Sequence, residues 1–73
     1  MLNNNNRSDM QSGDKMLSRD GMKTGSVITP YARKCTLEGC RSYRTSVRWE
    51  DGRITYPCMR AVKKISDGVY QIE

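Results

Sequence analysis

YRTSVRWEDGRITYPC, residues 43–58, is the stretch that decides the fold, because it has the pattern of a β-hairpin. Apolar and polar side chains alternate strictly over residues 43–49, which is the period of a strand with one buried face. Asp51-Gly52 then supplies a two-residue turn that suits a type I′ hairpin. The sequence therefore predicts two antiparallel strands joined at Asp51-Gly52.

This turn also predicts which side chains share a face, since successive residues of a strand point to opposite sides of the sheet. Arg44 and Arg48 fall on the polar side. Pro57 falls there too, and its missing N–H places the second strand at an edge or ends it there. The pairs expected on the apolar side are Trp49 with Ile54, Val47 with Tyr56, and Thr45 with Cys58.

Weaker signals flank the hairpin. Residues 27–29 are β-branched and begin a strand, which Pro30 confines to an edge or removes from regular pairing. Met59, Val62 and Ile65 recur at the spacing of a short helix.

Residues 69–72 form the last predicted strand, which leaves an alternative for the segment before it. A second hairpin across Asp67-Gly68 would pair Ile65 with Tyr70 well but Lys63 with Ile72 poorly. We therefore prefer the helix over residues 59–65.

Residues 1–26 have the composition of a flexible tail. They contain no aromatic residue, and residues 3–6 are four consecutive asparagines. Such a segment cannot bury enough apolar surface to offset the loss of backbone freedom. The expected fold class is α+β, mostly β: a small, mostly antiparallel sheet with one short helix. This compact basic domain spans residues 27–73 and is preceded by a disordered N-terminal tail over residues 1–26.

Positive charge is the strongest compositional signal. Residues 27–65 hold nine basic residues against three acidic ones, a net charge of +6. Such a field attracts acidic protein surfaces or nucleic-acid phosphates, and arginine suits bidentate contact with both. The expected partner-binding residues are Arg41, Arg44, Arg48 and Arg53 around the hairpin, with Val27, Ile28 and Tyr31 on an edge strand open to strand addition.

The sequence disfavours catalysis and metal binding. The chain lacks histidine, the commonest general base and a common zinc ligand. Its cysteines, Cys35, Cys40 and Cys58, are one short of the four ligands of structural zinc unless Glu38 or a partner's residue completes the set. We therefore expect no enzyme, no cofactor and no metal, and interpret Cys58 as a small core residue.

Cysteine count and hydropathy also bear on location. An odd number of cysteines fits a reducing cytoplasm better than a secreted disulfide framework. No apolar run is long enough to span a membrane. We expect a monomer that acts in the cytoplasm.

Three features of the whole chain point to a known family: its 73 residues, the opening Met1-Leu2-Asn3-Asn4-Asn5-Asn6, and a Tyr-rich basic body with three cysteines. The chain resembles the small RNA-polymerase-binding transcription regulators of lytic Xanthomonas phages. The resemblance implies binding to the N-terminal region of the bacterial RNA polymerase β′ subunit, near the RNA exit channel, in the host bacterial cytoplasm.

The resemblance further implies a regulator with two effects. It would inhibit initiation at host promoters by favouring loss of the σ factor, and it would suppress intrinsic termination, in contact with nascent RNA. The alternative from the residues alone is a β module that binds nucleic acid directly through an arginine face, because phosphate and carboxylate suit the same guanidinium geometry.

Overall fold

The computed structural model describes residues 9–73, which form a six-stranded sheet and a short 3-10 helix. The elements are β1 (Lys15–Leu17), β2 (Thr24–Lys34), β3 (Tyr43–Trp49), β4 (Ile54–Thr55), η2 (Met59–Ala61), β5 (Val62–Ser66) and β6 (Val69–Ile72). Across the sheet the order is β4-β3-β2-β1-β6-β5. Only the β1–β6 pairing within these residues is parallel. The expected fold class, mostly β with a mostly antiparallel sheet, is confirmed.

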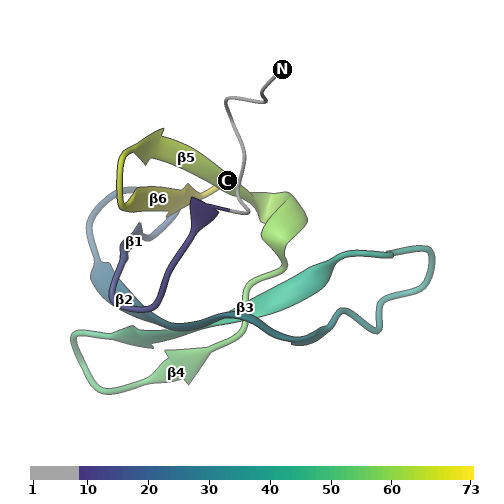
Figure 1. Cartoon of the computed structure of the whole chain (residues 1–73). Coiled ribbons are helices and arrows are strands. Elements are labelled where there is room, and N and C mark those ends of the chain that lie inside the picture. Colours follow the sequence, from purple (N-terminus) through teal and green to yellow (C-terminus); the bar gives the residue numbers. More distant parts are fainter. Residues whose placement is uncertain (1–8) are drawn as a thin grey trace.

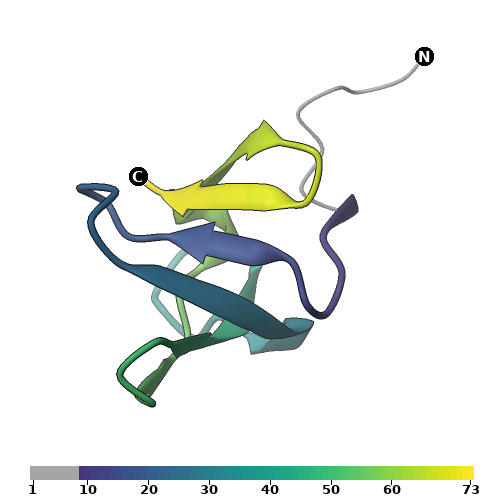
Figure 2. The ribbon, with the colours of Figure 1, turned by 90° about the vertical axis from the view of Figure 1, so that its left-hand side faces the viewer.

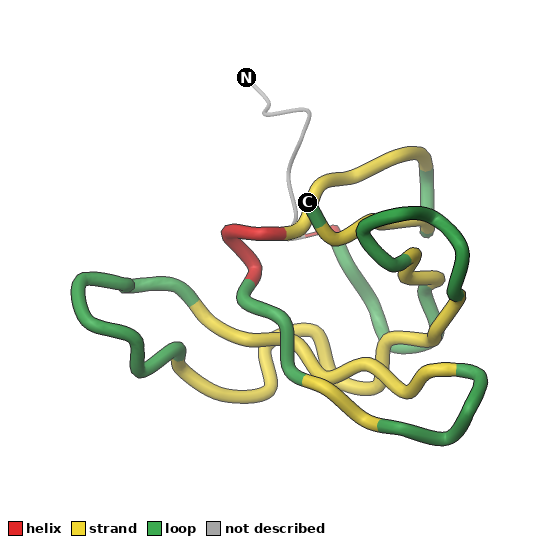
Figure 3. Tube along the Cα trace, turned by 180° about the vertical axis from the view of Figure 1, so that it is seen from behind, coloured by secondary structure: helices red, strands yellow, loops and turns green. Residues whose placement is uncertain are grey.

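The sheet is bent, so that β5, β6 and β1 lie over β2, β3 and β4 (Figures 1 and 2). The 3-10 helix, red in Figure 3, connects the two groups of strands. The core takes residues from five strands, from η2 and from the segment before β1. Its buried members are Met10, Met16, Val27, Val47, Met59, Val62 and Tyr70. Among residues 9–73 no helix is long and apolar enough to cross a membrane.

β2 and β3 continue past the body as a projecting hairpin, which we call the arm (residues 31–44; Figure 1). The β2–β3 register shifts between Thr29 and Arg33, around Pro30. Proline has no N–H to donate to the ladder, and a bulge accommodates it. The expected loss of regular pairing at Pro30 is therefore confirmed. Beyond the shift, Arg33 pairs with Arg44.

The hairpin between β3 and β4 turns through three residues rather than two. The Trp49 N–H donates to the Arg53 carbonyl at 2.8 Å, so residues 50–52 form the loop. A type I′ turn needs positive φ at both central residues, but Gly52 has φ 88° and no non-glycine residue between 9 and 73 has a positive φ. A three-residue loop of this kind needs only its glycine in the left-handed region.

The longer loop moves the second strand by one residue. Val47 pairs with Thr55 and Arg48 pairs with Ile54. The predicted pairs of Trp49 with Ile54, Val47 with Tyr56 and Thr45 with Cys58 are therefore wrong. A slip of one residue exchanges the two faces of a strand. Ile54 and Tyr56 are accordingly 43% and 38% exposed instead of buried.

Residues 59–72 combine both interpretations of the sequence. Residues 59–61 form the 3-10 turn, whereas residues 62–66 form β5 of a second hairpin with β6. The prediction of a helix through residue 65 is thus wrong. A register shift between Lys64 and Ser66 pairs Val62 with Ile72 and leaves Ile65 48% exposed. A bulge therefore removes the poor Lys63–Ile72 pair that had argued against this hairpin.

The interpretation of residues 1–26 as a flexible tail is wrong for residues 9–26; residues 1–8 lie outside the described part. β1 pairs with β2 on one side and with β6 on the other. Met10 and Met16 are 4% and 0% exposed. The composition of residues 1–26 did not predict β1, because a strand of three residues is too short to show a periodic pattern. Its hydrogen-bond partners also lie elsewhere in the sequence, in β2 and β6.

The buried β1 generates a stability prediction. Met16→Ala removes a fully buried side chain and should lower the free energy of unfolding by about 2–5 kcal/mol. The matched control is Met22→Ala, because Met22 is 78% exposed and its loss should change stability by about 0.5 kcal/mol or less. Urea unfolding followed by tryptophan fluorescence measures both. Equal stability of the two variants would contradict a folded β1.

The turn generates a second prediction. Gly52→Ala should cost about 1–2 kcal/mol, because alanine is strained in the left-handed region that Gly52 occupies. Asp51→Gly should also destabilise, by about 0.5–1 kcal/mol, because Asp51 does not need glycine's freedom. A type I′ turn would instead make Asp51→Gly stabilising. Thermal unfolding of both variants decides between the two turns.

Candidate binding face

The outer face of β2, β3 and β4 gathers arginine and exposed apolar groups. Arg44 and Arg48 are two strand periods apart on β3, so they point to the same side. Their Cα partners are Arg33 on β2 and Ile54 on β4, and Tyr56 lies two residues after Ile54. The arginine face, as we call it, consists of Arg33, Arg44, Arg48, Ile54 and Tyr56.

Contacts to Tyr56 order one half of this face. The Arg33 guanidinium carbon lies 4.3 Å from the centre of the Tyr56 ring, which is a cation–π arrangement. Arg44 Nη1 donates to the Tyr56 carbonyl at 2.6 Å. Both contacts use only part of each guanidinium, which has five N–H donors. Donors therefore remain for a carboxylate or a phosphate.

Thr45 and Ser46, which lie between Arg44 and Arg48 on β3, are buried and hydrogen-bonded. Ser46 is 5% exposed, and its hydroxyl accepts from the Thr29 N–H at 3.0 Å. Thr45 is 0% exposed and donates to the Thr29 carbonyl at 3.0 Å. These bonds join β2 to β3 at the position where the β2–β3 register shifts. The arginine face is thus carried by an ordered pair of strands rather than by a loop.

The arm exposes a second pair of aromatic rings. Tyr31 and Tyr43 meet edge to face, with ring centroids 5.8 Å apart. They are 44% and 42% exposed. Tyr43 is adjacent to Arg44 on β3 and therefore points to the opposite side of the strand. The arm thus presents aromatic surface on both sides, although the sequence pattern had assigned Tyr43 to the core.

The structure divides the predicted basic residues among three places. Arg44 and Arg48 lie on the arginine face, as predicted. Arg53 lies on the other side of the β3–β4 hairpin, because it is opposite Trp49. Arg41 is exposed in the loop at the end of the arm, beside a shallow hollow that Arg60 also lines. The sequence did not predict that Arg33 lies beside Arg44 on the arginine face, because this pairing depends on the β2–β3 register.

We predicted an edge strand at Val27, Ile28 and Tyr31, and this is wrong for Val27. β2 lies between β1 and β3, and the two edges of the described sheet are β4 and β5. Val27 is 3% exposed and belongs to the core. Ile28 and Tyr31 are exposed, but Val27 cannot contribute to strand addition.

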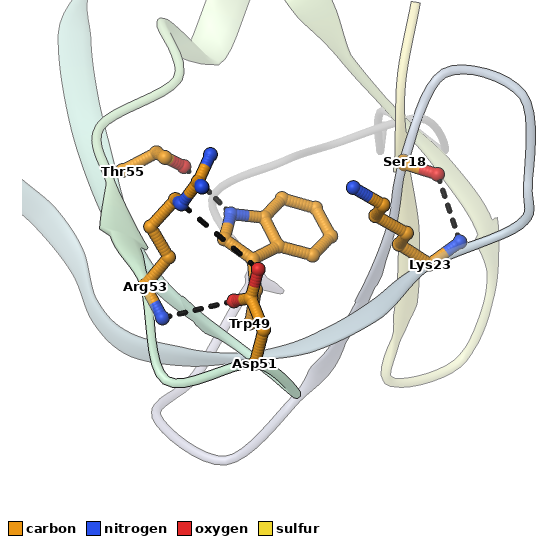
Figure 4. A pocket seen from close by; sticks show the side chains of 6 residues that line it. All are labelled: Ser18, Lys23, Trp49, Asp51, Arg53 and Thr55. Atoms are coloured by element: carbon orange, nitrogen blue, oxygen red, sulfur yellow. Dashed lines mark hydrogen bonds and ion pairs between the residues drawn. The ribbon is translucent and has the colours of Figure 1, made fainter.

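A small pocket lies on the side of the hairpin away from the arginine face (Figure 4). The Trp49 indole occupies its centre, and its Nε1–H donates to the Thr55 hydroxyl at 2.8 Å. Lys23 and Arg53 lie on either side of the indole (Figure 4). The Arg53 backbone N–H donates to the Asp51 carboxylate oxygen Oδ1 at 2.9 Å. Trp49 packs against the core, as its alternation predicted.

Three thiols meet where the loop of the arm approaches the segment before η2, next to the arginine face. The sulfur atoms of Cys35, Cys40 and Cys58 all lie within 4.8 Å of one another. Cys58 forms an isolated bridge with Arg44, which places the cluster beside that arginine. The Ser42 backbone N–H, helped by neighbouring side chains, lowers the pKa of the Cys40 thiol to about 7. Burial raises the pKa of the Cys58 thiol.

The sequence analysis considered the three cysteines as zinc ligands but set the site aside for want of a fourth ligand. Eighteen residues separate Cys40 from Cys58, and the predicted register placed Cys58 in the core. The observed register turns it to the side of Arg44 instead. The Cys35-x4-Cys40 spacing, with a glycine before the second cysteine, predicted a loop between these two thiols.

Comparison of the chain with protein-family models, with curated proteins and with solved structures gave no match.

Proposed function

We propose that this protein is a non-enzymatic transcription regulator that binds bacterial RNA polymerase through its arginine face. The observation that carries the proposal is the cluster of Arg33 on β2 and Arg44 on β3 with Tyr56, which directly follows β4. The polymerase, and the site on its β′ N-terminal region near the RNA exit channel, come from the resemblance. So do inhibition of host initiation through σ-factor loss and suppression of intrinsic termination.

The charge and geometry of the arginine face support an acidic partner. Arg33 and Arg48 are exposed, and Tyr56 adds an aromatic ring between cationic groups. Arginine and tyrosine are enriched where protein surfaces bind one another, because both combine hydrogen bonding with a large apolar contact. A carboxylate-bearing protein surface fits the face by bidentate hydrogen bonds and by stacking.

The absence of histidine from the sequence supports the non-enzymatic part of the proposal. Glu50 and Asp51 are exposed at the hairpin loop, where water screens their charges. Neither carboxylate has the desolvated setting that general acid–base catalysis requires.

A second candidate function is direct binding of single-stranded nucleic acid. The exposed rings of Tyr31, Tyr43 and Tyr56 favour it, because such proteins stack bases on aromatic side chains beside a positively charged groove. The predicted register would have buried Tyr56, whereas the observed one leaves it 38% exposed.

Charge reversal on two sides of the molecule tests the leading proposal. Arg33→Glu with Arg48→Glu should weaken capture of core RNA polymerase by about tenfold or more, because like charges oppose at the interface. The control is Lys15→Glu with Lys63→Glu, which makes the same change in net charge at exposed positions on β1 and β5. Capture is measured from nuclease-treated lysate with tagged protein.

The outcomes separate the two candidates. Capture of polymerase that survives nuclease and fails only for the arginine pair supports the proposal. If both double variants lose polymerase capture equally, the loss is due to the lower net charge and not to the arginine face. If nuclease removes the polymerase altogether, the protein-binding proposal is wrong. Direct nucleic-acid binding then predicts a salt-dependent affinity for RNA, with a slope of about −0.7 per phosphate neutralised, that Tyr56→Ala weakens and Tyr56→Phe preserves.

A further inference from the structure

The three cysteines stand on backbone that hydrogen bonds already order. Cys35 directly follows β2, and its N–H donates to the Ser42 carbonyl at 2.9 Å. The Cys40 N–H donates to the Leu37 carbonyl at 3.0 Å, which closes a turn of the arm loop. Cys58 directly precedes η2, and its carbonyl accepts from the Ala61 N–H at 2.9 Å. Three separate segments thus direct their sulfurs to one point.

The spacing of the sulfurs fits a metal better than a disulfide. A tetrahedral zinc with bonds of about 2.3 Å to sulfur requires sulfur atoms roughly 3.8 Å apart. The Cys40 and Cys58 sulfurs are 3.7 Å apart, and all three sulfurs lie within 4.8 Å of one another. A disulfide needs about 2.05 Å and would use only two of the three thiols. The cluster therefore requires little movement to become one face of a tetrahedron.

We propose that Cys35, Cys40 and Cys58 bind one Zn²⁺ ion, with a water molecule as the exchangeable fourth ligand. Thiolates are soft ligands that favour zinc over magnesium or calcium. Among residues 9–73 the group of ligand side chains consists of these three cysteines, and the whole chain has no histidine. Cys40 and Cys58 are half-buried, so water can reach this group of thiols as a fourth ligand.

The surroundings of Cys40 suit the charge of such a site. Three thiolates and one Zn²⁺ carry a net charge of about −1, and each thiol must give up a proton on binding. The Ser42 backbone N–H and the Arg60 side chain both lower the pKa of the Cys40 thiol and so favour its thiolate form. Arg41 and Arg60 line the adjoining hollow. Donors of this kind around a metal-bound thiolate orient it and offset its charge.

Zinc at this point would join the arm to the body. Cys35 and Cys40 belong to the arm and its loop, whereas Cys58 belongs to the segment before η2. The backbone of Cys58 forms an isolated β-bridge with that of Arg44, which lies on the arginine face. The metal would therefore fix the arm relative to β4 and η2 at the end of that face. This inference concerns the thiols alone and does not require the proposed polymerase binding.

Cobalt substitution tests the site directly. The reduced full-length protein, prepared without metal, is titrated with Co²⁺ and followed by the thiolate-to-cobalt charge-transfer absorption. We expect one equivalent to bind, and Zn²⁺ to displace it stoichiometrically. Cys40→Ser lies in the loop, where folding depends little on it, and should weaken Co²⁺ binding by at least about tenfold. Amide NMR spectra of the variant establish that it stays folded.

Glu38→Gln is the matched control, since Glu38 is the acidic residue of the same loop. Unchanged cobalt binding by this variant supports a water ligand, whereas a loss comparable to that of Cys40→Ser would overturn the open fourth position. Failure of the reduced wild-type protein to take up Co²⁺ or Zn²⁺ would overturn the site itself. So would cobalt binding that survives Cys40→Ser together with Cys58→Ser in folded protein.

Discussion

The backbone conformation of Gly52 is the constraint on which the binding surface depends. Its positive φ ends a three-residue loop, and that loop fixes the β3–β4 register. With this register Ile54 pairs with Arg48, and Cys58 bridges to Arg44. A loop one residue shorter would turn Tyr56 and Cys58 into the core. The cation–π contact of Arg33 with Tyr56 and the convergence of the three thiols both follow from this one turn.

The register needs a body to support it, and β1 supplies the centre of that body. The strand is short, yet it hydrogen-bonds to β2 on one side and to β6 on the other. Met16 is fully buried between them and packs in the same cluster as Val47 of β3. Through these two pairings β1 connects β2 to the last strand, β6, so that β2 is an inner strand of the sheet. The arm can then project from a closed core while its outer side remains free for arginine and tyrosine.

The sequence allowed much of this fold to be predicted, but not the parts that depend on distant contacts. Strict alternation located β3 and placed Arg44 and Arg48 opposite the core. It could not distinguish a two-residue from a three-residue loop, because Asp51-Gly52 suits both and a single residue decides. β1 escaped because its hydrogen-bond partners lie elsewhere in the chain. The convergence of the three thiols could not be predicted for the same reason, because Cys58 meets Cys35 and Cys40 only in the observed register.

Cross-strand NOE contacts between Hα protons across the β3–β4 hairpin test the central claim most directly. Opposed residues of an antiparallel pair that do not exchange hydrogen bonds bring their Cα atoms about 4.5 Å apart, which makes these protons neighbours. The account predicts Hα–Hα contacts of Arg48 with Ile54 and of Arg44 with Cys58. Contacts of Trp49 with Ile54, or of Val47 with Tyr56, would contradict it, because that register returns Tyr56 to the core and separates the arginine face from its aromatic ring.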